Sequence, residues 1–149
     1  IYAAGDCCQG NNLQSGQTQI IGLWANAGVQ GRVAGTNMAG KHDETDGNIL
    51  HNITHFLDMD FIGLGDNRIT GDVYEYVNKK KGFYLRAVLK DGKPVGFNIL
   101  DNYGISGILK AHLIKLLRGE SCTFTPEQRV RLQQLGIDEE FIEYLEAVV

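Results

Sequence analysis

A carboxylate that closes an apolar run is the first group in this chain suited to binding a ligand. Residues 1–6 form a short, apolar, β-type segment that ends in Gly5-Asp6. Glycine at such a turn lets the backbone approach a ligand closely, and an ionised carboxylate accepts hydrogen bonds from hydroxyl groups. We therefore consider Asp6 a candidate ligand-binding residue. The alternative is that Asp6 only ends a strand.

A glycine-rich helix is predicted to follow, over residues 18–38. Glycine in an exposed helix interior costs roughly 1 kcal/mol relative to alanine, so close approach of the backbone to another group explains the glycines better than chance. The first turn of a helix also carries unpaired N–H groups and a partial positive charge. The alternative is that the small residues only permit packing. They are Gly22, Ala25, Ala27, Gly28, Gly31, Ala34 and Gly35.

Histidines and acidic residues raise the question of a metal site. His51 and His55 lie four residues apart, a spacing that suits zinc on a helix. The residues around them favour a strand, where the two side chains would share a face about 13 Å apart. A second group, in the polar segment 41–47, combines His42 with three acidic residues. We predict no metal ion at either place.

The cysteines and the remaining histidine give no sign of catalysis. Cys7 and Cys8 are adjacent, and neighbouring cysteines rarely bridge each other; the odd total of three suits a reducing compartment. Cys122 is expected to be a small core residue. His112 lies on the apolar face of its predicted helix, where a packed histidine is more common than a base. We predict no catalytic residue in this chain.

The composition is that of an ordinary soluble globular protein, with 43% hydrophobic and 21% charged residues. The net charge of −4 argues against nucleic-acid binding, which requires a basic face. The start of the chain lacks the features of a secretion signal. Polar residues interrupt the stretch 20–38, so we predict no membrane span. A cytoplasmic location is the default expectation.

The first residues of the chain form a predicted strand that lacks partner strands in this sequence. A lone strand cannot satisfy its own backbone N–H and C=O groups, so residues 1–6 should belong to a sheet whose other strands lie upstream. We therefore expect that Ile1 is not the natural start. The polar segment 41–47 is the best candidate for a domain boundary, which divides the chain into residues 1–46 and 47–149.

The second of these segments has the alternating pattern of strands. One strand is predicted over residues 49–57, continuing through 61–64. Asp91-Gly92 lies between two apolar runs and predicts a hairpin, because both central positions need a positive φ. The basic run that precedes Gly82 is expected to be a solvated turn. We expect an antiparallel sheet of at least three strands. The others are predicted over residues 73–77, 83–89 and 95–100.

The remainder of the chain is predicted to be helical. Apolar residues recur at helical spacing from Ile105 to Leu117, and Gly119 follows the end. Thr125 begins a capping box with a proline at the first helical position. Asp138 can cap a last helix. The predicted fold class is α+β, an antiparallel sheet with C-terminal helices. The apolar face of the last helix consists of Phe141, Ile142, Leu145 and Val148.

Two motifs resemble the pyridine nucleotide–disulfide oxidoreductase superfamily. Tyr2-Ala3-Ala4-Gly5-Asp6 is similar to its second FAD-binding motif. Residues 23–35, with Asn26-Ala27-x-x-Gln30-Gly31-Arg32, resemble the helix that follows this motif in NADH oxidases, NADH peroxidases, rubredoxin and ferredoxin reductases and NADH-nitrite reductases. The later strands and helices are similar to the family's C-terminal interface domain. The resemblance is specific over the first motifs and loose after them.

The resemblance implies the C-terminal portion of an FAD-dependent NAD(P)H oxidoreductase. Asp6, with Gly5, would contact the ribityl chain of FAD. The backbone of Gly22, Leu23 and Trp24 would face the pyrimidine edge of the flavin and stabilise negative charge on the reduced ring. Residues 1–46 would be the last strand and long helix of the FAD-binding domain. Residues 47–149 would be the interface domain, through which such enzymes form homodimers.

Other parts of such an enzyme are absent from these residues. Neither the Gly-x-Gly-x-x-Gly fingerprint for FAD nor a second one for NAD(P)H is present. NAD(P)H should therefore bind upstream domains of the same polypeptide, and this fragment alone is not expected to hold FAD or to be active. The electron acceptor and the choice of NADH or NADPH stay open. The alternatives are a stand-alone, non-enzymatic interaction domain and an unrelated small-molecule-binding domain.

Aromatic residues of the predicted sheet argue separately for self-association. They supply more aromatic surface than one amphipathic helix covers, and aromatic residues are enriched at interface cores. The alternative is that the two C-terminal helices cover this surface within the molecule. The residues are Tyr74, Tyr76, Phe83, Tyr84 and Phe97.

Overall fold

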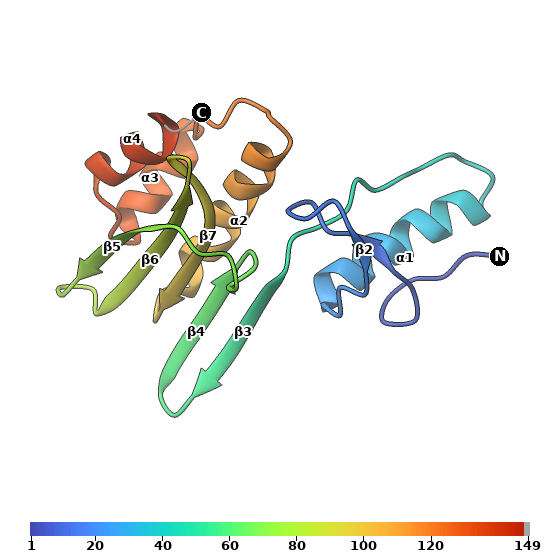
Figure 1. The fold of residues 1–149 in the computed structure, drawn as a ribbon, viewed down its shortest axis with the longest axis horizontal. Coiled ribbons are helices and arrows are strands. Elements are labelled where there is room, and N and C mark those ends of the chain that lie inside the picture. Colours follow the sequence, from blue (N-terminus) through green and yellow to red (C-terminus); the bar gives the residue numbers. More distant parts are fainter. Residues whose placement is uncertain (148–149) are drawn as a thin grey trace. The chain divides into compact units, whose positions relative to one another are not determined.

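The computed structural model describes residues 1–147 (Figure 1). The chain divides into two compact units, and the boundary along the sequence lies between Leu50 and His51. Val148, expected on the apolar face of the last helix, lies outside the described residues. The assignment of the two segments to an FAD-binding and an interface domain stays a prediction. No helix among the described residues is long and apolar enough to cross a membrane.

The first unit contains a small hairpin and one long helix. β1 (Gly10–Asn11) pairs with β2 (Thr18–Gln19), and α1 spans Trp24–Met38. The helix was predicted to begin at Thr18, six residues before its actual start at Trp24. The prediction was wrong there because Thr18 and Gln19 pair with β1 instead. Leu23 is extended, with φ −132°, and precedes the first helical residue. The helix ends as predicted before Gly40, which has a φ of +80°.

The segment before Asp6 does not form the predicted strand. Residues 1–4 have no regular secondary structure, and a turn follows in which Cys8 N–H donates to Gly5 O at 3.1 Å. No strand among the described residues pairs with this segment. Because a strand is defined by its hydrogen-bonded partner, the extended segment remains irregular here.

Residues 41–50 fold back onto the first unit rather than forming a loose linker. Asn37 accepts a hydrogen bond from Asp43 N–H at 3.1 Å and donates to Asp43 O at 2.8 Å. Arg32 forms an ion pair with Asp43. Further along the chain, Asn48 forms an isolated parallel β-bridge with Asn12. The segment is thus attached to α1 through Asp43 and to the β1 region through Asn48.

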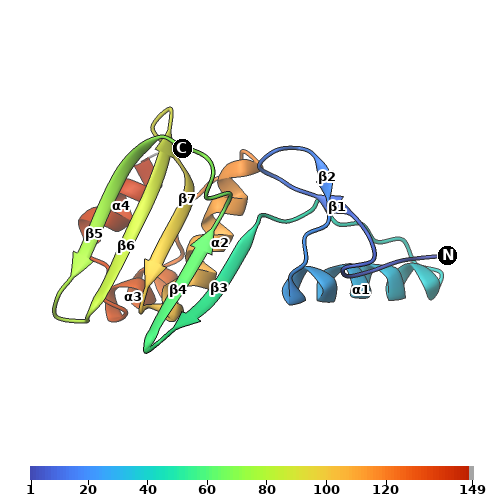
Figure 2. The ribbon, with the colours of Figure 1, turned by 60° about the horizontal axis from the view of Figure 1, so that its bottom comes forward.

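The second unit is a five-stranded antiparallel sheet with helices on one face (Figures 1 and 2). The strand order is β3-β4-β7-β6-β5. The expected α+β fold, with an antiparallel sheet and C-terminal helices, is confirmed. The strands are β3 (His51–Phe56), β4 (Met59–Leu64), β5 (Asp72–Asn78), β6 (Phe83–Lys90) and β7 (Lys93–Leu100).

Two turns show where sequence signals succeeded and failed. Asp91 and Gly92 form the predicted hairpin between β6 and β7, with φ values of 52° and 75°. The single strand predicted over residues 49–64 is wrong, because β3 and β4 form a hairpin that turns at Leu57. Leu57 has a φ of 54°, a conformation that a γ-branched apolar residue seldom adopts.

Three helices follow the sheet: α2 (Tyr103–Leu117), α3 (Pro126–Gln134) and α4 (Glu139–Ala147). The predicted capping box is present, since Thr125 accepts from Gln128 N–H and Gln128 accepts from Thr125 N–H. Asp138 accepts a hydrogen bond from Phe141 N–H at 2.9 Å, as predicted. α2 packs against β4 and β7. The core includes the fully buried residues Ile62, Leu85, Phe97, Ile99, Leu109, Leu113 and Phe141.

Three aromatic residues of β5 and β6, Tyr74, Tyr76 and Phe83, are covered within the unit. Phe141 of α4 stacks on Tyr74 and Tyr76 with ring centroids 5.0 and 5.5 Å apart, and Tyr144 stacks on Tyr74 at 5.1 Å. Phe83 is buried. The alternative, that the C-terminal helices cover the aromatic surface, therefore holds for Tyr74 and Tyr76. Tyr84 is half-buried and donates to Glu75 instead, and self-association stays a prediction.

Candidate functional site

The structure brings Asp6 together with the segment that leads into α1. The Asp6 carboxylate oxygens lie 3.6 and 3.8 Å from the position that a Cβ would occupy on Gly22. Gly22 is exposed and stands two residues before the first residue of the helix. Two predicted site residues that are 16 positions apart in sequence are therefore neighbours in space. The site therefore combines the negative charge of a carboxylate with the partial positive charge of a helix N-terminus.

The other two predicted backbone donors, Leu23 and Trp24, differ in whether their N–H group already has a partner within the chain. Leu23 N–H donates to Ile21 O at 2.8 Å, so this group is already used within the chain. No side chain caps the N-terminus of α1, and Trp24 is 94% exposed. The backbone N–H groups of Gly22 and Trp24 are thus the ones that could face a ligand.

Two buried polar residues of α1, which the sequence analysis did not single out as site residues, hold this arrangement in place. Gln30 Oε1 accepts hydrogen bonds from Gly5 N–H at 2.8 Å and from the Cys8 thiol at 3.4 Å. Asn26 donates to Ile21 O at 3.1 Å. One residue fixes the turn that carries Asp6 and the other fixes the segment that carries Gly22. The sequence feature that could have indicated this role is the spacing of the two amide side chains, which are one helical turn apart and therefore lie on the same side of α1.

Gly5 allows the turn to pass close to the helix. Its φ is +83°, a region that favours glycine, and a Cβ at this position would lie 3.6 Å from Ala27 Cβ. The site is therefore built by α1 itself, which contacts both the turn and the approach to its own first residue.

A shallow cavity opens beside the same helix. Its volume is about 280 Å³. Its walls come from the irregular first residues, the β1 region and the buried side of α1, so it is enclosed by one unit only. Its lining includes Tyr2, Cys8, Gly10, Gln30, Val33 and Ala34.

The histidines of the second unit do not form a metal site. Among residues 1–147, no group of three or more His, Cys, Asp or Glu side chains could hold a metal ion. His51 and His55 lie on β3, as predicted. His51 Nδ1 lies 3.1 Å from Lys110 Nζ, and burial lowers the pKa of His51, with the charge of Lys110 acting in the same direction. His55 contacts Asp60.

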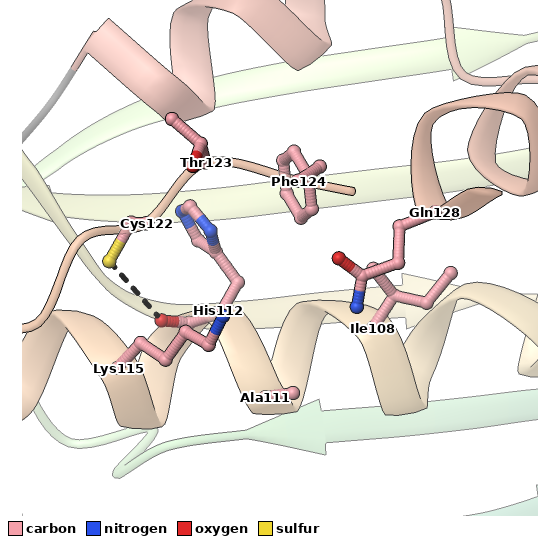
Figure 3. A pocket seen from close by; sticks show the side chains of 8 residues that line it. All are labelled: Ile108, Ala111, His112, Lys115, Cys122, Thr123, Phe124 and Gln128. Atoms are coloured by element: carbon pink, nitrogen blue, oxygen red, sulfur yellow. Dashed lines mark hydrogen bonds between the residues drawn. The ribbon is translucent and has the colours of Figure 1, made fainter. Parts of the chain in front are cut away.

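His112 and Cys122 are core residues, as predicted. They are 3% and 1% exposed, and burial lowers the pKa of His112 and raises that of Cys122. Figure 3 shows the His112 ring pointing from α2 toward the segment that carries Cys122 and Phe124. The ring stacks on Phe124 at 4.7 Å. A cavity of about 10 Å³ beside it has room for one water molecule.

Sequence and structure comparisons find oxidoreductases that this chain resembles over part of their length. No family model matches. Over 77 residues, half of the chain, it is 34% identical to the CoA-dependent NAD(P)H sulfur oxidoreductase of Pyrococcus furiosus, and the match spans 17% of that protein.

Two solved structures share the fold. An FAD-dependent pyridine nucleotide-disulphide oxidoreductase from Desulfovibrio vulgaris matches with a TM-score of 0.65 and 19% identity, over 99% of this chain and 38% of the other. A NAD-dependent persulfide reductase from A. fulgidus also has a TM-score of 0.65, with 20% identity over 80% of this chain and 25% of the other. The chain therefore shares its fold with these oxidoreductases over 25% to 38% of their length.

Proposed function

We propose that this chain is the C-terminal portion of an FAD-dependent NAD(P)H oxidoreductase. Asp6 and the first turn of α1 contact FAD, and the unit that begins at His51 forms a homodimer. The observation that carries the first part is the approach of the Asp6 carboxylate to Gly22 at the start of α1. The chain spans between 17% and 38% of the relatives described above.

The residues present suit the part of FAD assigned to them. An exposed carboxylate accepts hydrogen bonds from the hydroxyls of a ribityl chain. A helix N-terminus without a side-chain cap favours negative charge at the pyrimidine edge of a flavin. Gly22 presents no side chain that would keep a ring away from the backbone. The bound flavin would carry hydride chemistry between NAD(P)H and an acceptor.

Most of the binding energy must come from elsewhere in the enzyme. The chain has no nucleotide fingerprint, and one carboxylate with one helix end cannot offset the cost of immobilising a large cofactor. We therefore expect NAD(P)H and most of FAD to be bound by upstream domains, and the isolated chain to bind FAD more weakly than micromolar. Fluorescence quenching in an FAD titration measures this, and micromolar affinity would contradict it.

The test of Asp6 uses the full-length enzyme. Asp6→Ala removes a hydrogen bond to a charged group, worth roughly 1.5–3 kcal/mol or about ten- to a hundredfold in affinity. Flavin absorbance after dialysis measures retention, and circular dichroism reports folding. Glu44→Ala is the matched control, since Glu44 is exposed and lies within ion-pair distance of His42, another exposed residue. Equal flavin content in both variants would reject the role of Asp6.

A further inference from the structure

The sheet has two edges, and only one is protected. β3 and β5 each pair with a single neighbour. Natural edge strands are commonly guarded by charged residues or proline. β5 contains Asp72 and Glu75, whereas β3 contains no Lys, Arg, Asp, Glu or Pro among its six residues. The edge at β3 therefore lacks these means of preventing further pairing.

The hydrogen-bonding groups of β3 that point to this edge can be assigned. Asp60 O accepts from Asp101 N–H at 2.9 Å and Asp60 N–H donates to Asp101 Oδ1 at 2.8 Å, both on the β7 side of β4. The residue opposite, His55, therefore directs its backbone away from β4. Because the direction alternates along an antiparallel pair, Ile53 and His51 do the same. Three residues offer N–H and C=O groups at the edge.

The two ends of this strand differ in charge. At its start, Lys110 lies against His51, and Lys110 forms no ion pair within residues 1–147. At its other end lie Asp58, in the turn, and Asp60, opposite His55. An identical strand placed antiparallel would bring the basic end of one copy next to the acidic end of the other. The charge pattern is thus self-complementary.

We propose that β3 pairs with β3 of a second copy of this chain, antiparallel, to join two five-stranded sheets into one. This rests on the proposed homodimer and names the surface that forms it. A twofold axis perpendicular to the sheet keeps the helices of both copies on one face. Such isologous pairing is the most common symmetry of soluble dimers. Strand addition at an open edge supplies the main-chain bonds, and Lys110 opposite Asp60 of the second copy sets the direction.

Sedimentation equilibrium of the whole chain tests the edge. Ile53→Lys places a charge on β3 and should raise the dimer dissociation constant at least about tenfold. Val77→Lys is the control on β5, where Val77 is 58% exposed, and should leave it unchanged. Circular dichroism checks that both variants fold. Equal effects of the two substitutions, or a wild-type chain that stays monomeric to about 100 μM, would overturn the proposal while leaving the flavin role of Asp6 to its own test.

Charge reversal tests the direction of pairing. Lys110→Glu and Asp60→Lys should each weaken the dimer about tenfold, because each places like charges at the junction of the two copies. The double variant restores an opposite pair and should return the dissociation constant to within about threefold of wild type. A double variant as weak as either single one would overturn the antiparallel arrangement.

Discussion

Gln30 accepts a hydrogen bond from Gly5 N–H at 2.8 Å, and this bond joins the middle of α1 to the turn that carries Asp6. The position of a candidate cofactor ligand is therefore set by a residue 25 positions away. Asn26, one helical turn earlier, fixes the segment before the helix in the same way. One face of α1 thus organises both halves of the site.

Replacing Gln30 should loosen the turn. Gln30→Met keeps the length of the side chain but removes the acceptor, and leaving Gly5 N–H unpaired should cost about 1–3 kcal/mol in the free energy of unfolding. Urea denaturation measures the loss, and faster amide exchange at Gly5 shows that it is local. Gln9→Met, at an exposed glutamine, is the control. Unchanged exchange at Gly5 would contradict the role of Gln30.

His112 should make the second unit sensitive to acid. Burial holds its pKa below the ordinary 6.5, and Lys115 acts in the same direction, against opposing effects that include the charge of Glu146. The unfolded chain therefore binds a proton at a higher pH than the folded one. Stability should fall as the pH drops through 6.5 toward the lowered value and stay constant above it.

The control for this pH dependence is built into the chain. His112→Gln removes the titrating group and should flatten the stability profile between pH 7 and pH 5 relative to wild type. Gln9→Met, which leaves every histidine in place at an exposed position, should leave the profile as it is. The measurement is the urea midpoint as a function of pH. Parallel profiles for His112→Gln and wild type would exclude His112 as the cause.

Phe141 should be essential for the packing of α4. It is fully buried and stacks on Tyr74 and Tyr76. Phe141→Ala should destabilise the second unit by about 3–5 kcal/mol, through lost transfer energy and the cavity left behind. Val130→Ala, on α3 at a side chain that is 52% exposed, should change stability by less than about 0.5 kcal/mol. Denaturation followed by near-ultraviolet circular dichroism compares the two.

Gly31 of α1 has open space where a side chain would stand. Apart from its chain neighbours and the backbone of its own helix, no described atom lies within 4 Å of a Cβ built on Gly31. Gly31→Ala should therefore stabilise the isolated chain by about 1 kcal/mol. Gly47→Ala is the contrasting variant, since its Cβ would lie 2.1 Å from Asn11 O, and it should destabilise. Thermal unfolding checks both. A destabilising Gly31→Ala in the isolated chain would mean that a contact inside the chain requires this glycine.

The sequence predicted elements that are specified by local chemistry. The turn at Asp91-Gly92 was predicted correctly because both residues tolerate a positive φ. The helix start at Thr125 was predicted correctly because the Thr125 hydroxyl accepts a hydrogen bond from the backbone N–H three residues later. The turn at Leu57 was missed because leucine seldom adopts a positive φ, and because Asp58 is followed by Met59 rather than by the glycine that marks the Asp91-Gly92 turn. The helix start at Trp24 was missed because it depends on the pairing of β1 with β2.

For the candidate site, the sequence indicated the residues but not what holds them. Asp6 and Gly22 were identified from motif resemblance, and their proximity depends on Asn26 and Gln30. Such bonds across a turn and a helix are tertiary, so no window of neighbouring residues reveals them. Leu23 illustrates the opposite case, because a bond to Ile21, only two residues away, occupies its N–H.

The strand order has a consequence for how the second unit folds. Three of its four neighbouring strand pairs are sequential hairpins, and only β4 with β7 joins strands separated by two others. Closing that loop costs entropy before any contact between β4 and β7 is made. We therefore expect β3–β4 and β5–β6–β7 to be two fluctuating pieces whose docking limits the folding rate. α2, which follows β7 and packs on both β4 and β7, is the element that secures the docked state.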